Sequence, residues 1–128
     1  MMATQKTYAD AYQVENDEFR ASFVTWIEDK LDVVKSSAIV DNRPLPKEEV
    51  FDRTKELLYA LSKKGIKPMF INPSVDGGIM VEFEDKGIYR MVEIDNEDDI
   101  VLLIRDKEKT EAFDLTPRNY LVQILDRI

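Results

Sequence analysis

The segment that decides the fold is Pro73–Ile94, which reads PSVDGGIMVEFEDKGIYRMVEI. Two runs of alternating character, 79–84 and 88–94, flank the dipeptide Lys86-Gly87. Such runs joined by two turn-forming residues predict a β-hairpin with a two-residue loop. The preceding Asp76-Gly77-Gly78 predicts a second turn, and because a strand follows it, the phosphate-binding geometry of a helix N-terminus is missing there.

The register of this hairpin decides which side chains share a face of the sheet. With a two-residue loop, Phe83 faces Arg90 and Val81 faces Val92. A shift by one residue would move every side chain to the opposite face, so a clean partition supports the register. The apolar face carries Ile79, Val81, Phe83, Val92 and Ile94, and the second face carries Met80, Glu82, Glu84, Tyr89, Met91 and Glu93.

Two helices are expected before the hairpin. The first runs from Asn16, a candidate cap, to about Ser36, and the second begins at Pro46 and stops at Gly65. The polar residues 1–15 either extend the first helix backwards or form a flexible arm. The apolar stripe of the first helix is expected to be core and comprises Phe19, Phe23, Trp26, Ile27, Leu31 and Val34.

The remaining strands extend the sheet on both sides of the hairpin. Residues 67–73 predict a short edge strand bounded by prolines, 100–104 predict an apolar strand, and 110–115 predict a polar edge strand. A short helix capped by Thr116 is then expected to bury Leu121, Val122, Leu125 and Ile128. The fold class predicted is α+β: two N-terminal helices, an antiparallel four- to five-stranded β-meander and a short C-terminal helix, in a single domain over residues 1–128.

The composition narrows the function classes. The chain carries 26 acidic and 18 basic residues, with no cysteine and no histidine. Residues 66–128 hold 14 acidic and 8 basic residues, so most of the net negative charge lies there. Direct nucleic-acid binding is not expected, because it needs clustered bases. No apolar run is long enough to span a membrane, and the N-terminal residues lack the apolar stretch of a signal peptide, so neither is expected. A cytoplasmic protein is expected.

The only constellation of chemical interest is the acidic turn over 95–99. Its carboxylates alternate as in a calcium-binding loop, but Ile100 stands where that loop requires glycine. A solvated turn and a weak, incidental cation site both remain open. We predict no catalytic residues, no cofactor and no metal site.

The second face of the hairpin is the candidate binding surface. Mixed methionine, tyrosine and carboxylate side chains suit a partner interface, although partial cover by the N-terminal helices is the alternative. The candidate partner-binding residues are Met80, Glu82, Tyr89, Met91, Asp95, Glu97, Asp98 and Asp99.

Residues 68–128 resemble small uncharacterised bacterial proteins. The resemblance rests on Pro73, on Asp76-Gly77-Gly78, and on strands that close with Glu82-Phe83 and Glu93-Ile94. It continues through Phe113-Asp114-Leu115-Thr116-Pro117, and Glu97-Asp98 departs from the usual Asp-Gly turn. It implies a bacterial or phage origin and a compact fold of sheet and helix, and it implies no activity.

Three hypotheses follow for the function. The first is a non-enzymatic protein–protein interaction module, a regulator or inhibitor such as an antitoxin or immunity protein. The second is an acidic chaperone-like homodimer that uses the apolar fourth strand and a helix as its seam. The third is an enzyme that acts through carboxylates and a divalent metal.

Overall fold

The computed structural model describes residues 22–128 of the chain. The chain divides into two compact units, Met1–Lys30 and Leu31–Ile128, and the single domain over 1–128 stays a prediction. The expectations for residues 1–15, Asn16 and Phe19 lie outside the described residues.

Residues 22–40 are helical, so the first helix continues past its predicted end at about Ser36. In the first unit, the rings of Phe23 and Trp26 stack with centroids 5.8 Å apart, and Ile27 is fully buried. In the second unit, Leu31 and Val34 are buried, as the apolar stripe predicts.

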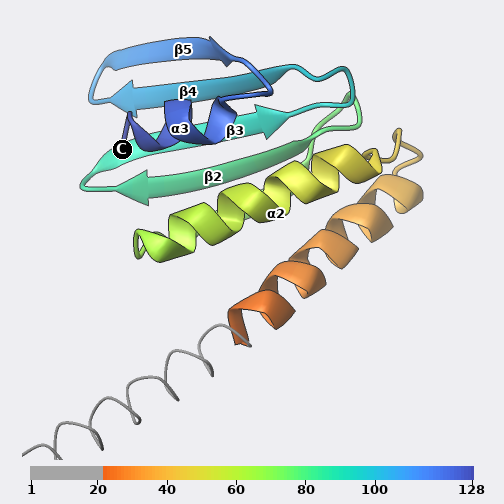
Figure 1. Ribbon diagram of the computed structural model, residues 1–128. Coiled ribbons are helices and arrows are strands. Elements are labelled where there is room, and N and C mark those ends of the chain that lie inside the picture. The colour runs from red at the N-terminus through yellow and green to blue at the C-terminus, as the bar shows by residue number, and fades with distance from the viewer. Residues whose placement is uncertain (1–21) are drawn as a thin grey trace, which may run out of the picture. The chain divides into compact units, whose positions relative to one another are not determined.

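The second unit is built on a five-stranded antiparallel sheet whose strands follow one another in chain order (Figure 1). This confirms an α+β fold with a meander. The strands are β1 (Phe70–Pro73), β2 (Ile79–Asp85), β3 (Ile88–Ile94), β4 (Ile100–Asp106) and β5 (Lys109–Leu115).

The hairpin register is the one predicted. Phe83 pairs with Arg90 and Val81 pairs with Val92 across β2 and β3. The loop residues Lys86 and Gly87 both have positive φ, 54° and 80°, which is the backbone that a two-residue loop of type I′ requires.

Two labelled helices lie on the same side of this sheet (Figure 1). α2 spans Glu48–Lys63 and α3 spans Tyr120–Leu125. Together with the sheet they enclose the core. Its fully buried side chains include Val50, Leu57, Leu58, Leu61, Ile79, Val81, Phe83, Val92, Ile94, Leu102 and Ile124.

α2 ends as predicted but begins two residues later. Gly65 has a φ of 75°, and the amide of Ile66 donates to the carbonyl of Leu61, which closes the helix in a Schellman motif. Its first turn starts after Lys47 instead of at Pro46, because the backbone N–H of Lys47 donates to Asn96 Oδ1 at 2.7 Å. The contact with Asn96 holds this part of the chain extended.

The prediction for the last helix was wrong about where the helix begins and which of its faces is buried. α3 begins at Tyr120, and the residues expected to form its first turn make a separate turn in which Asn119 donates to the carbonyl of Thr116. Tyr120 and Ile124 are buried, whereas Val122 is 60% exposed and neither Leu121, Leu125 nor Ile128 is fully buried. Thr116 does not cap the helix; its backbone N–H and hydroxyl lie within hydrogen-bond distance of Gln123 Oε1.

Candidate functional site

The second face of the sheet lacks a covering layer within the Leu31–Ile128 unit. The core face of β2 and β3 is buried, whereas side chains on the opposite face are half-buried or exposed. We call this second face the open face. By strand register it comprises Phe70, Asn72, Met80, Glu82, Glu84, Tyr89, Met91, Glu93, Val101, Leu103, Arg105, Thr110, Ala112 and Asp114.

Apolar side chains run across the middle of the open face. Cross-strand pairing aligns Met91 with Leu103 and Leu103 with Ala112, and we call these three residues the apolar row. At the other edge of the sheet, Phe70 pairs with Glu82. Phe70 is 55% exposed. This row contains the contacts that a partner could bury.

Four of the predicted partner-binding residues lie on the open face. These are Met80, Glu82, Tyr89 and Met91, each half-buried. The contribution of β1, β4 and β5 to the same surface was not predicted from the sequence. The apolar run of β4 is the signal that could have found it, because alignment with β3 places Val101 and Leu103 on the same face as Met91 and Glu93.

Tyr89 is fixed in place on this surface. Its hydroxyl donates to Glu82 Oε1, and the guanidinium of Arg105 lies 5.0 Å from the centre of its ring. Burial and the bond to Glu82 raise the pKa of Tyr89 to about 12. The Glu82 carboxylate therefore has a neutral hydroxyl as its neighbour at physiological pH.

Glu93 marks the most acidic part of the open face. Burial raises the pKa of its carboxyl, and the neighbouring charges of Asp95 and Asp76 raise it further. Because the ionised form of this carboxyl is disfavoured, a cation placed beside it would stabilise the ionised form.

The acidic turn holds the other four predicted residues, and two of them have structural roles. Asp95 Oδ1 accepts hydrogen bonds from the backbone N–H groups of Glu97 and Asp99, at 2.9 and 3.1 Å. Asp98 forms an ion pair of 2.8 Å with Arg53 of α2. Glu97 and Asp99 direct exposed side chains to solvent.

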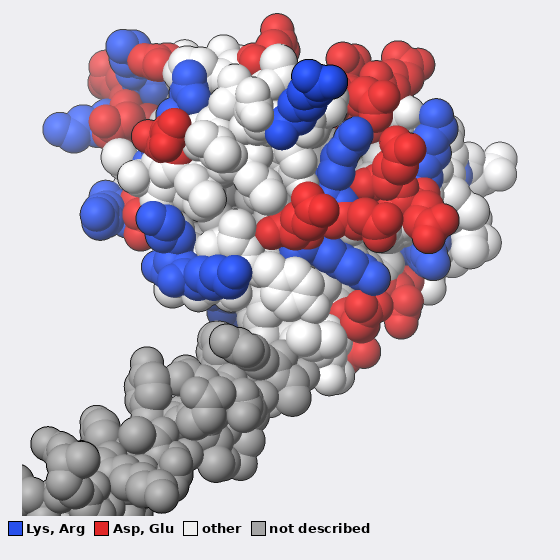
Figure 2. All heavy atoms as spheres, viewed as in Figure 1, with Lys and Arg blue, Asp and Glu red and all other residues white. Residues whose placement is uncertain are grey.

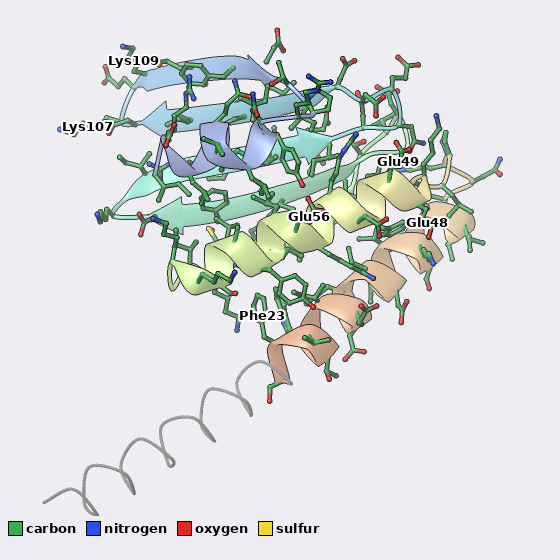
Figure 3. All side chains as sticks on the ribbon, in the orientation of Figure 1. Phe23, Glu48, Glu49, Glu56, Lys107 and Lys109 are labelled. Atoms are coloured by element: carbon green, nitrogen blue, oxygen red, sulfur yellow. The ribbon has the colours of Figure 1, made fainter. Side chains whose placement is uncertain are left out.

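Charge is distributed unevenly along the sheet. Figure 2, which views the molecule from the side of α2 and α3, shows acidic side chains gathered at the end where α2 begins. Figure 3 places Glu48 and Glu49 at that end and Lys107 and Lys109 at the opposite end. A basic partner would therefore be attracted most strongly to the end that carries the acidic turn.

The carboxylates of the described residues form no metal centre. No group of three or more histidine, cysteine or acidic side chains in residues 22–128 is arranged to hold a metal ion. Within the same residues, every helix is too short or too polar to cross a membrane.

The Asp76-Gly77-Gly78 element forms a turn. Gly77 has a φ of 88°, and the backbone N–H of Gly78 donates to Ser74 Oγ at 2.8 Å. The backbone N–H of Ser74 also donates to the carbonyl of Gly78, so the Ser74 side chain and the backbone of this turn connect β1 to β2.

No protein-family model, no curated protein and no solved structure matches this chain. The geometry of the open face is therefore the basis for its proposed function.

Proposed function

We propose that this chain is a small cytoplasmic, non-enzymatic interaction module, a regulator or inhibitor of the antitoxin or immunity type, that binds a basic protein partner on the open face. The supporting observation is one arrangement on the open face: a central apolar row, with Glu82 beside Met91 in the same row, Glu93 and Asp114 on one side of the row and Glu84 on the other. Among the described strand residues, Arg105 is the only basic side chain on that face.

The apolar row supplies the area for binding. Met91 and Leu103 lie side by side at its centre and are half-buried before any partner arrives. Complete burial of a side chain of this size contributes roughly 1.5–3 kcal/mol relative to full exposure, so each of them contributes part of that amount. Methionine also adapts its shape to different partner surfaces.

The carboxylates supply the selectivity. An amphipathic segment with apolar residues on one side and lysine or arginine along its borders would place cations beside Glu84, Glu93 and Asp114. The net charge of −8 also favours rapid association with a basic partner at low ionic strength.

Titration with synthetic amphipathic peptides tests this proposal. Two peptides with the same apolar pattern, one lysine-rich and one glutamate-rich, are added to the isotopically labelled chain and followed by NMR. We expect only the basic peptide to bind and to shift the signals of Met80, Met91 and Leu103. Its affinity should fall as salt is added.

Matched variants locate the binding surface. Met91→Arg should weaken binding of the basic peptide about tenfold, because it removes apolar contact and adds a like charge. Val122→Arg introduces the same charge on α3, where Val122 is 60% exposed, and should leave binding unchanged. Equal binding of the two peptides, or equal effects of the two variants, contradicts the proposal.

A further inference from the structure

The outer edge of β5 is available to a further strand. β1 forms the opposite edge of the sheet, but it has only four residues and ends at Pro73. β5 has seven residues and contains neither proline nor glycine. Figure 1 shows no element beyond β5, and no strand of the described residues pairs with its outer side. A regular edge of this length is a template for pairing with another chain.

The register identifies the backbone groups that point outward. Asp106 and Lys109 flank the two-residue loop between β4 and β5, so they form a hydrogen-bonded pair. Hydrogen-bonded and non-hydrogen-bonded pairs alternate along an antiparallel ladder. The N–H and C=O groups of Thr110, Ala112 and Asp114 therefore point away from β4. All three residues are exposed.

These three residues complement a second copy of themselves. When two β5 strands run antiparallel with Ala112 opposite its own copy, Thr110 of each copy lies opposite Asp114 of the other. The threonine hydroxyl can then donate to a carboxylate that has no ion-pair or hydrogen-bond partner among the described residues. Arg105 pairs with Thr110 in β4, but its guanidinium lies over the Tyr89 ring on the β3 side, so the threonine hydroxyl is the donor to that carboxylate.

The other face of β5 is complementary in the same register. Glu111 of one copy lies opposite Phe113 of the other. The guanidinium of Arg127 lies 4.5 Å from the centre of the Phe113 ring in its own chain. Each Glu111 carboxylate therefore faces an arginine of the second copy, in addition to its own ion pair with Lys109 at 2.7 Å.

Neighbouring registers lack this complementarity. A shift in one direction places Glu111 directly opposite its own copy, and like charges in that position are destabilising. A shift in the other direction places Asp114 opposite Ala112 and brings the two Arg127-covered Phe113 rings together. Of these three registers, only the one centred on Ala112 places a hydroxyl donor opposite Asp114 on one face and an arginine opposite Glu111 on the other.

We propose that two copies of this chain associate through antiparallel pairing of β5, about a two-fold axis beside Ala112, so that their sheets become one. The two open faces then join into one surface, with the apolar row continuing from Leu103 through both Ala112 residues to the second Leu103. This seam differs from the apolar fourth strand, because β4 is paired on both sides. The inference does not depend on the proposed function.

Sedimentation equilibrium of the full chain and amide hydrogen exchange test the inference together. We expect a monomer–dimer equilibrium. As the concentration rises, the amides of Thr110, Ala112 and Asp114 should become protected from exchange. The amides of Glu111 and Phe113 point toward β4 and should be protected at every concentration.

Charge variants test the register. Ala112→Lys places two cations at the axis and should raise the dissociation constant about tenfold or more. Asp114→Lys should also weaken the dimer, because it removes the carboxylate that accepts from Thr110. The addition of Thr110→Asp should restore the dimer, because each introduced carboxylate then lies opposite an introduced lysine of the other copy. Asn72→Lys on the edge strand β1 is the matched control and should have no effect.

Three results overturn the inference. The first is that the chain remains monomeric at the highest soluble concentration. This also holds if its β5 edge pairs only with a strand of another protein. The second is a dimer that tolerates Ala112→Lys while circular dichroism shows the variant to be folded. The third is a dimer that Asn72→Lys or Met91→Arg disrupts instead. Peptide binding to the open face would be unaffected by these results, so the two proposals fail separately.

Discussion

The hydroxyl of Tyr120 donates a hydrogen bond of 2.5 Å to Glu56 Oε2 and lies 3.2 Å from the carbonyl oxygen of Arg53. This contact joins α3 to the middle of α2, and Figure 3 shows Glu56 on the side of α2 that is turned toward α3. Tyr120 itself is 5% exposed. The contact therefore sets where α3 begins and which of its faces is buried.

Tyr120→Phe should lower the free energy of unfolding by about 1–2 kcal/mol, because it removes the hydroxyl and preserves the ring. Urea denaturation monitored by circular dichroism measures the change. Glu56→Gln is the control, since an amide oxygen still accepts the bond, and it should cost less. Equal losses in the two variants would show that the hydrogen bond stabilises α3 only when its acceptor is a charged carboxylate.

Stability should fall at alkaline pH. The ordinary pKa of tyrosine is 10.0, and burial together with the bond to Glu82 raises the pKa of Tyr89 to about 12. Burial and the bond to Glu56 also raise the pKa of Tyr120. The folded state therefore holds these protons more tightly than the unfolded state. The resulting stability is present below about pH 10 and is lost as the pH rises toward 12.

Urea denaturation at a series of pH values from about 9 to 11 measures this loss. The double variant Tyr89→Phe, Tyr120→Phe retains all lysines, so it reports the contribution of the other titrating groups. We expect a shallower decline in the double variant. Parallel curves for the two proteins would contradict the assignment.

The glycines of the two turns should differ in their tolerance of alanine. A Cβ at Gly78 would lie 2.4 Å from the carbonyl oxygen of Ile94 and 2.8 Å from Asp95 Cα, both backbone atoms. Gly78→Ala should therefore cost at least about 2 kcal/mol. A Cβ at Gly87 meets nothing within 4 Å, and only its φ of 80° resists substitution, which costs about 1–2 kcal/mol.

Thermal and urea denaturation of the two alanine variants compare these costs. If Gly87→Ala lowered the free energy of unfolding more than Gly78→Ala, the backbone of β3 would move away easily from Gly78. That result would also show that the close approach does not fix the turn at Asp76-Gly77-Gly78.

Arg90 is a buried cation that can be replaced. Its side chain is on the core face of β3 and is 5% exposed, its Nε donates to the carbonyl of Arg127 at 3.0 Å, and its Nη1 has no partner among the described residues. Burial of a charged group without full pairing is costly.

Arg90→Met should leave the free energy of unfolding unchanged or raise it by up to about 2 kcal/mol, because methionine fills a similar volume without charge. Arg90→Ala leaves a cavity and should lower it by about 2–4 kcal/mol. Chemical denaturation of both variants distinguishes volume from charge. A loss in Arg90→Met as large as that in Arg90→Ala would show that the bond to Arg127 is essential for α3.

The sequence by itself determined the sheet. The hairpin register, the turn at Lys86-Gly87, the short edge strand before it and the stop of α2 at Gly65 were all predictable. They depend on alternation and turn chemistry within a few residues. The candidate residues of β2 and β3 on the open face followed from the same register.

Only the tertiary structure decided the starts of the helices and the extent of the open face. α2 begins after Lys47 because Asn96, 49 residues away, bonds to its backbone. α3 begins at Tyr120, which bonds to Glu56, 64 residues away. Local patterns carry no information about such distant partners. Likewise, the side chains of β1, β4 and β5 became one surface with Met80 and Met91 only when the strands were aligned.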